Sequence, residues 1–260
     1  MKILVITEED EFYLPGCLNR FLGNVIHKHE VVGVVLAKNT LLPSPWAAAW
    51  KFLGIFGVWP VLQQAFRLAS AKLRDRLRGF LGQDRIFSMR DVCRRWEVEC
   101  QKVDDVNAAT FLQVVWGQRV DLIVSISPTQ KFQEDLLQAA PAGCINIHSS
   151  KLPKFRGLYP TYWAMASGER ETGVTVHFMN DWIDQGGIIL QHAVQIPPGC
   201  SMDAMLKKTK AVGADLLAEA VTMIAAGSVK PFLPKEEGSY FSFPTKESYR
   251  AFRRLGYRLW

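Results

Sequence analysis

Three side chains between residues 146 and 184 could together catalyse attack on a carbonyl carbon: the amide of Asn146, the imidazole of His148 and the carboxylate of Asp184. Asn146 and His148 stand two apart in a short apolar run typical of a buried strand, so their side chains share one face. Asp184 follows in a turn-rich stretch between the β-like runs 174–178 and 188–193. A strand end and a nearby loop can present an oxyanion donor, a proton carrier and an orienting carboxylate to one substrate.

A purely structural role competes with this interpretation, because single histidines in strands are commonly packed residues and an Asp before Gln-Gly-Gly is commonly a turn. The order of the motifs favours catalysis. They are Asn146-x-His148-x-Ser150, Leu152-Pro153-Lys154-Phe155-Arg156-Gly157 and Ile183-Asp184-Gln185-Gly186-Gly187. In this order they resemble the formyl-transfer domain that uses 10-formyltetrahydrofolate, found in methionyl-tRNA formyltransferase, glycinamide ribonucleotide transformylase and the sugar N-formyltransferases. The resemblance covers residues 1–200 and is strongest over 120–195.

The resemblance implies a role for each of the three residues. Asn146 donates to the oxyanion of the tetrahedral intermediate, a contact worth roughly 3 to 4 kcal/mol in a dry site. His148 either stabilises that oxyanion as a cation or carries a proton to the leaving nitrogen, and its pKa decides between the two. Asp184 orients His148 and takes up the proton of the attacking amine. Ser149 stands where the family often has Pro or Ala.

The resemblance also implies a folate pocket and an acceptor site, and no metal. The residues expected to hold 10-formyltetrahydrofolate are Ser127, Pro128, Thr129, Gln130 and Asp181. The residues expected to contact the amine substrate are Thr7, Glu8, Arg156 and Tyr159. Because Arg156 is basic and the segment 7–11 is acidic, we expect a small amine that also carries a phosphate.

Apolar runs at 2–6, 31–36 and 121–126, separated by helical segments, predict an α/β fold. Such runs are typical of a mostly parallel, Rossmann-like sheet with helices on both faces, whose ligands bind at the carboxyl ends of the strands. No Gly-x-Gly-x-x-Gly follows the first run. Four consecutive carboxylates at 8–11 stand there instead, which argues against a dinucleotide cofactor.

Composition adds limits on location and on partners. The net charge of +6 and the basic segments, 67–85 and the C-terminal tail, favour a phosphate-bearing partner without choosing among sugar nucleotide, lipid and RNA. Five scattered cysteines and an opening run without a signal-peptide pattern favour a reducing, cytoplasmic location. The remaining histidines, His27, His29, His177 and His192, are expected to be non-catalytic.

The segment 40–85 is a tryptophan-rich insertion that the resemblance does not explain. A helix is expected over 61–81, with apolar residues along one side and arginines and a lysine along most of the other. The longest uncharged run, 52–66, contains Pro60 and falls short of the ~20 residues of a spanning helix. Two interpretations stay open. The insertion covers the sheet or forms a homodimer contact, or it lies at the inner face of a membrane with its tryptophans in the bilayer surface.

Two parts are expected: a catalytic domain over 1–200 and a C-terminal helix with a basic extension over 201–260. Methionyl-tRNA formyltransferases carry an additional C-terminal β-barrel, for which residues 201–260 leave no room, so tRNA is the disfavoured acceptor. The preferred function is formyl transfer to the primary amine of a nucleotide-linked amino sugar. The alternatives are formylation of a lipid-linked amine, tRNA formylation, and a catalytically silent binding module.

Overall fold

A seven-stranded sheet forms the centre of the molecule in a computed structural model that describes residues 1–42, 44–76 and 88–260. Its strand order is β3-β2-β1-β4-β5-β7-β8. The strands are β1 (Lys2–Glu8), β2 (Glu30–Ala37), β3 (Cys100–Val103), β4 (Leu122–Ile126), β5 (Cys144–His148), β7 (Glu171–Phe178) and β8 (Ile188–Gln195). The first five run parallel, whereas β7 and β8 are antiparallel to their neighbours. The predicted α/β, mostly parallel sheet is confirmed.

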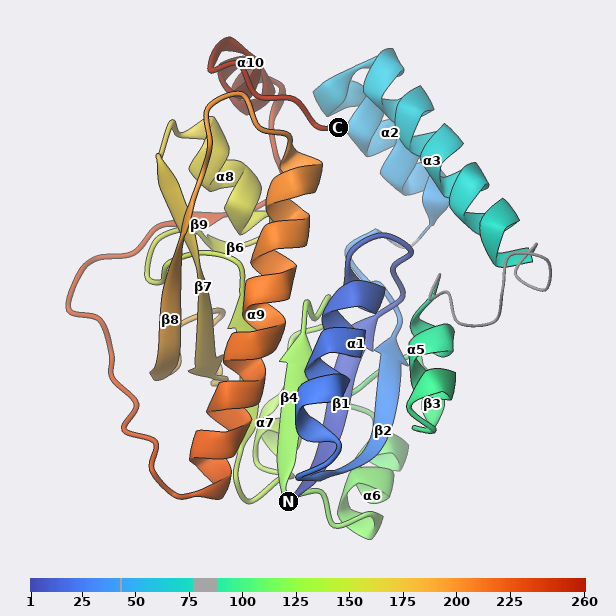
Figure 1. Cartoon of the computed structure of the whole chain (residues 1–260), viewed down its shortest axis with the longest axis vertical. Helices are drawn as coiled ribbons and strands as arrows, with labels where there is room; N and C mark the ends of the chain where they lie inside the picture. The colour runs from blue at the N-terminus through green and yellow to red at the C-terminus, as the bar shows by residue number, and fades with distance from the viewer. Residues whose placement is uncertain (43, 77–87) are drawn as a thin grey trace.

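Alternate residues of the central strands enter two separate cores, one on each face of the sheet. Ile3 and Val5 of β1 pack with helices α1 (Leu14–Val25), α5 (Met89–Arg95) and α9 (Met202–Ala225). Leu4 and Ile6 pack on the opposite face with α6 (Ala109–Gly117). Burial on both faces explains why these strands are apolar without alternation. Helix α9, at the start of the predicted C-terminal extension, lies beside α1 in the main core (Figure 1).

The rest of the C-terminal segment returns to the Leu-Pro-Lys-Phe-Arg-Gly motif. Strand β9 (Tyr240–Phe241) pairs with β6 (Arg156–Gly157). Just before these two strands, the backbone N–H of Phe155 donates a hydrogen bond to Ser239 Oγ over 2.8 Å. Two helices nearby are α8 (Pro160–Ala166) and α10 (Lys246–Arg254), whereas α7 (Glu134–Leu137) packs with α6 in the other core. The motif is therefore fixed by residues more than eighty positions later in the chain.

The insertion forms a helical hairpin of α2 (Pro45–Phe56) and α3 (Val58–Arg76). Residues 77–81 of the helix expected over 61–81 lie outside the described residues. Figure 1 shows the hairpin beyond the carboxyl ends of the strands, so the expectation that it covers the sheet is wrong. Its attachment to the body includes Phe56, whose ring meets Tyr162 and Tyr249 edge-on. None of the described helices combines the length and apolarity needed to cross a bilayer.

Candidate active site

The structure brings Asn146, His148 and Asp184 together at the carboxyl end of β5. Asn146 and His148 project from β5 in the same direction, and Asp184 reaches them from the loop between β7 and β8. His148 Nδ1 lies 3.5 Å from Asp184 Oδ2, and the two side chains are only 7% and 9% exposed. The pair is thus almost completely removed from water, where electrostatic interactions are strong.

His177 joins the three, although the sequence predicts it to be non-catalytic. It stands opposite Asn146 in the pairing of β5 with β7. Its Nε2 lies 3.3 Å from Asn146 Nδ2 and 3.5 Å from Asp184 Oδ1. His177 Nδ1 donates to the carbonyl of Phe178 over 2.7 Å, and the Asn146 amide N–H points its donor at Nε2. No local sequence signal indicates this contact, since the β5–β7 register is a long-range property.

Two glycines allow the Asp184 loop to approach its neighbours. The backbone N–H of Gly157 donates to Asp184 Oδ2 over 2.8 Å. Gly186 packs against the backbone of Phe178, where an added Cβ would lie 1.8 Å from the carbonyl oxygen. The Asp-x-Gly spacing therefore has a steric reason: any larger residue at 186 would push the loop, and Asp184 with it, away from the strand.

Asp184 is ionised and His148 is neutral at neutral pH. Burial raises the pKa of Asp184, but the nearby imidazoles of His148 and His177 and the Gly157 N–H outweigh it, so that this pKa falls to about 2. Burial lowers the pKa of His148, against the opposing effects of Asp184 and the Phe155 carbonyl. His148 Nε2 lies 2.8 Å from Phe155 O and donates to it. The neutral imidazole consequently keeps Nδ1 unprotonated, facing an ionised carboxylate.

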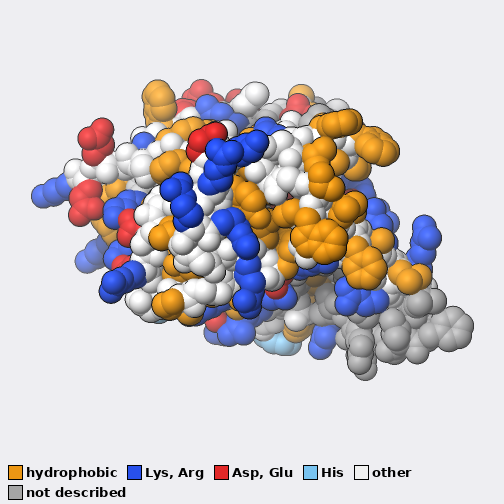
Figure 2. All heavy atoms as spheres, turned by 90° about the horizontal axis from the view of Figure 1, so that it is seen from above, with side chains coloured by type: hydrophobic (Ala, Val, Ile, Leu, Met, Phe, Trp, Pro, Cys, Tyr) orange, Lys and Arg blue, Asp and Glu red, His pale blue; other side chains and the backbone are white. Residues whose placement is uncertain are grey.

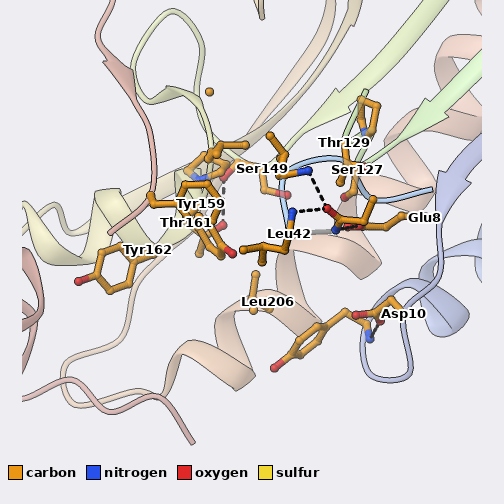
Figure 3. Close-up of a pocket in the computed structure, with 18 of the residues that line it drawn as sticks. Glu8, Asp10, Leu42, Ser127, Thr129, Ser149, Tyr159, Thr161, Tyr162 and Leu206 are labelled. Carbon is orange, nitrogen blue, oxygen red and sulfur yellow. Dashed lines mark hydrogen bonds between the residues drawn. The ribbon is translucent and has the colours of Figure 1, made fainter. Parts of the chain in front are cut away.

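These residues line a cavity of about 1080 Å³. One end is polar and includes Glu8, Ser127 and Thr129, and another part is formed by Tyr159, Thr161 and Tyr162 (Figure 3). The helical hairpin supplies an apolar wall. Its lining residues are Pro45, Trp46, Ala48, Ala49, Phe52 and Phe56 from α2, and Pro60, Val61, Gln64, Ala65 and Leu68 from α3. The cavity thus joins the buried catalytic groups to the insertion.

Some of the other predicted site residues line this cavity and others do not. Those that line the cavity are Glu8, Ser127, Pro128, Thr129, Gln130 and Tyr159. Of these, Gln130 acts within the protein, because its amide accepts from Val106 N and donates to Lys38 O and Asp104 O. This arrangement braces the loops rather than leaving the amide free for a ligand.

Thr7, Arg156 and Asp181 are not among the residues that line the cavity, contrary to prediction. Thr7 is fully buried and its hydroxyl donates to Ile126 O over 2.9 Å. Arg156 belongs to β6, where its backbone N–H donates to Ser239 O over 2.8 Å. Its position is decided by the pairing with β9, which proximity to the motif does not reveal.

A half-buried acid, Glu8, and a buried lysine, Lys210, lie at the polar end of the cavity. Burial, with help from Asp10 and against Lys210, raises the pKa of Glu8 to about 7, and Asn39 Nδ2 donates to its Oε2 over 2.9 Å. Lys210 of α9 is 9% exposed and donates to Ser127 Oγ over 2.5 Å. Sequence reasoning missed Lys210. The available signal is its place on the apolar stripe of α9, with Gly213, Ala214 and Leu217.

Comparison with known proteins relates part of this chain to formyl transferases. Residues 95–221 match the family described as formyl transferase. Methionyl-tRNA formyltransferase of Anaeromyxobacter dehalogenans (strain 2CP-C) is 37% identical over 131 residues, which are 50% of this chain and 41% of that protein. The match thus spans less than half the length of this curated relative.

Two solved structures share the fold. Glycinamide ribonucleotide transformylase 1 from Symbiobacterium toebii has a TM-score of 0.63 at 20% identity, over 89% of this chain and 94% of that one. A formyltransferase from Anoxybacillus kamchatkensis has a TM-score of 0.50 at 24% identity, over 62% of this chain and 84% of that one. Residues 95–221 thus match the formyl transferase family in sequence, and the motifs and the site geometry agree with that match.

Proposed function

We propose that the protein transfers a formyl group from 10-formyltetrahydrofolate to a primary amine. The amine nitrogen attacks the formyl carbon, the bond between that carbon and N10 of the folate breaks, and one proton passes from the amine to N10. The observation that carries the proposal is the buried pair of a neutral His148 and an ionised Asp184, beside the Asn146 amide, at the wall of a large cavity. This set provides for both the proton and the developing negative charge.

Asn146 is the oxyanion donor in this mechanism. Its amide nitrogen carries two hydrogens, one of which can donate to His177 Nε2, so the second is available to the substrate oxygen. The side chain is 4% exposed, so little water competes for it. A donor placed in this way contributes roughly 3 to 4 kcal/mol to stabilising the transition state.

His148 and Asp184 handle the proton. The lowered pKa of His148 supports the proton-carrier role over the cationic one, because a neutral Nδ1 can accept a proton from the attacking amine. The carboxylate of Asp184 then stabilises the imidazolium across 3.5 Å. The imidazolium returns the proton to the leaving nitrogen, which restores the neutral ring.

The proposed folate site is the part of the cavity beside Asn146. Ser127, Pro128 and Thr129 line it together with Asn180 and Trp182 of the Asp184 loop. Asn146 Oδ1 is buried and has no hydrogen-bond partner within the described part of the protein. Such an atom costs free energy unless a ligand donor reaches it, which fits a pterin with several N–H groups. Asp181 and Gln130 would contribute only through the positions of these loops.

An amino sugar is the acceptor class that we propose. The formyltransferase from Anoxybacillus kamchatkensis was solved in complex with UDP-4,6-dideoxy-4-formamido-L-AltNAc and tetrahydrofolate. In this chain Glu8 could bind the ammonium of such a sugar, and Tyr159 could contact its ring, since both line the cavity. A nucleotide carrier is the first candidate. A lipid carrier is the second, and the apolar wall formed by α2 and α3 favours it specifically.

The test is incubation of the purified protein with 10-formyltetrahydrofolate and a panel of acceptors, followed by mass spectrometry for the formylated product. The panel contains nucleotide-linked amino sugars, lipid-linked amines and initiator methionyl-tRNA, because the Anaeromyxobacter dehalogenans relative is a methionyl-tRNA formyltransferase. We expect product with an amino sugar, and product formation that is at least a hundredfold slower with His148→Ala. Formylation of the tRNA alone would refute the acceptor class, and no product with any amine would refute the proposed function.

A further inference from the structure

Helix α3 turns its apolar stripe away from the body of the protein. Trp59, Leu62, Phe66 and Leu73 recur at helical spacing and are 69%, 55%, 74% and 56% exposed. In a surface helix that packs on its own protein, such a stripe faces the core. In this protein, these four side chains are instead exposed to solvent.

The opposite side of α3 holds the hairpin to the protein, and it does so partly through a charge. Arg67 Nη2 donates to Asp203 Oδ1 over 2.6 Å, and its guanidinium lies 3.9 Å from the ring centroid of Trp260. Val61 and Leu68 line the cavity from the same helix. The arrangement therefore fixes which side of α3 faces outward: rotating the helix to bury the stripe would break the Arg67 contacts.

Cations border the exposed stripe, and α2 extends it. Lys72, Arg74 and Arg76 are exposed on α3, and at 100° per residue Arg74 falls on one border of the stripe and Lys72 and Arg76 on the other. Two further exposed rings stand on α2: Trp50, and Trp46, which also borders the cavity. Figure 2 shows the result from above: hydrophobic side chains gather on the right, the side of α2 and α3 in Figure 1, with lysine and arginine nearby. The sequence 45–76 contains one acidic residue, Asp75.

We infer that this face of α2 and α3 docks on the surface of an anionic lipid bilayer. Tryptophan rings are suited to the boundary between acyl chains and headgroups, and flanking lysines and arginines can extend to lipid phosphates. A second copy of the chain fits less well. A two-fold contact through the stripe would bring the cations of both copies together.

Docking has a consequence for the acceptor, and this part rests on the proposed function. The outward side of the hairpin would lie on lipid while its inward side lines the cavity that contains His148. An amine on a lipid carrier could then enter between headgroups and active site without crossing water. Docking on a bilayer thus favours a lipid carrier over a nucleotide carrier for the amino sugar.

The test measures vesicle binding, which needs neither folate nor acceptor. The full chain is sedimented with phosphatidylcholine vesicles that contain phosphatidylglycerol, and with phosphatidylcholine vesicles alone. We expect binding to the anionic vesicles and much less to the neutral ones. The variant W59Q/L62Q/F66Q should lower the partition coefficient at least tenfold, and K72Q/R74Q/R76Q should remove the preference for anionic vesicles. The matched control is W116Q/L233Q, which replaces exposed apolar residues elsewhere.

Circular dichroism checks that each variant is folded, and the single variant Trp59→Gln replaces the triple variant if the latter is not. The docking inference is overturned if the wild-type chain stays in the supernatant with anionic vesicles, or if stripe and control variants bind equally. It is also overturned if the stripe variant merely converts a dimer into a monomer. Vesicle binding without formylation of any amine would retain the surface and reject the formyl-transfer proposal; soluble-acceptor activity without vesicle binding would do the reverse.

Discussion

The backbone N–H of Gly157 donates a hydrogen bond to Oδ2 of Asp184 over 2.8 Å. This contact joins the loop of the carboxylate to β6, and β6 is itself held by β9. At Gly157 φ is +90°, and an added Cβ would lie 2.2 Å from Phe241 O. A single glycine therefore lets a late segment of the chain come close enough to orient the carboxylate that faces His148.

Replacing either member of the buried pair should abolish most of the activity. His148→Ala removes the proton carrier and Asp184→Asn removes the charge that stabilises the imidazolium. Each should lower kcat by about 10²- to 10⁴-fold in an assay of formyl transfer. His192→Ala is the control, because His192 is exposed on β8. Near wild-type turnover in either active-site variant would show that the assigned role is wrong.

The pH dependence of kcat/KM should show an acidic limb below the ordinary His pKa of about 6.5. Burial lowers the pKa of His148, and the neutral ring is the active form, so activity rises with pH through this lowered pKa. Asp184→Asn removes an influence that raises the pKa and should move the limb to still lower pH. A limb at or above about 6.5 in the wild-type protein would indicate a cationic His148 in catalysis.

Glu8→Gln should change how stability depends on pH. The folded-state pKa of Glu8 is raised to about 7, so the wild-type protein should lose stability as pH rises from about 4.5 to about 7. Glutamine does not ionise. Urea unfolding should therefore show no gain for Glu8→Gln near the lower pH and a gain of about 3 kcal/mol relative to wild type above pH 7. Glu9→Gln, at an exposed position, controls for the general loss of a negative charge. A constant difference between the proteins at all pH values would contradict the prediction.

Gly186→Ala should destabilise the protein and displace Asp184. The new Cβ would lie 1.8 Å from Phe178 O, so the loop must move. Because backbone has to shift, we expect a loss of about 1 to 3 kcal/mol in the free energy of unfolding, together with a lower kcat. Gly16→Ala in α1 is the control, since its Cβ would meet no atom within 4 Å. Equal stability of the two variants would mean that the loop accommodates a side chain at 186.

Folate analogues should raise the melting temperature, whereas nicotinamide dinucleotides should not. Binding to the folded state at about 100 times the Kd adds about 2.7 kcal/mol to stability. The segment after β1 carries Glu8 and Asp10 at the cavity, where a dinucleotide phosphate would be repelled. Thermal melts with 5-formyltetrahydrofolate and with NAD make the comparison. Stabilisation by NAD alone would overturn the proposed co-substrate.

Much of this protein was determined by local sequence. Continuous apolar runs predicted β1, β2, β4 and β5, because strands buried on both faces need apolar side chains at every position. The two-residue spacing of Asn146 and His148 placed both on one side of β5. The turn-rich stretch between two β-like runs placed Asp184 in a loop. These are short-range properties, which spacing and residue type express directly.

Only the tertiary structure decided which other residues reach the site. His177 enters it through the register of β5 against β7, and Lys210 through the packing of α9 across the sheet. Arg156 stays out because β6 pairs with β9. Helix α3 makes the same point: its periodicity predicts an apolar side, but the contacts of Arg67 determine that this side faces outward. Periodicity fixes which residues share a face, while the direction of that face depends on contacts between segments far apart in the chain.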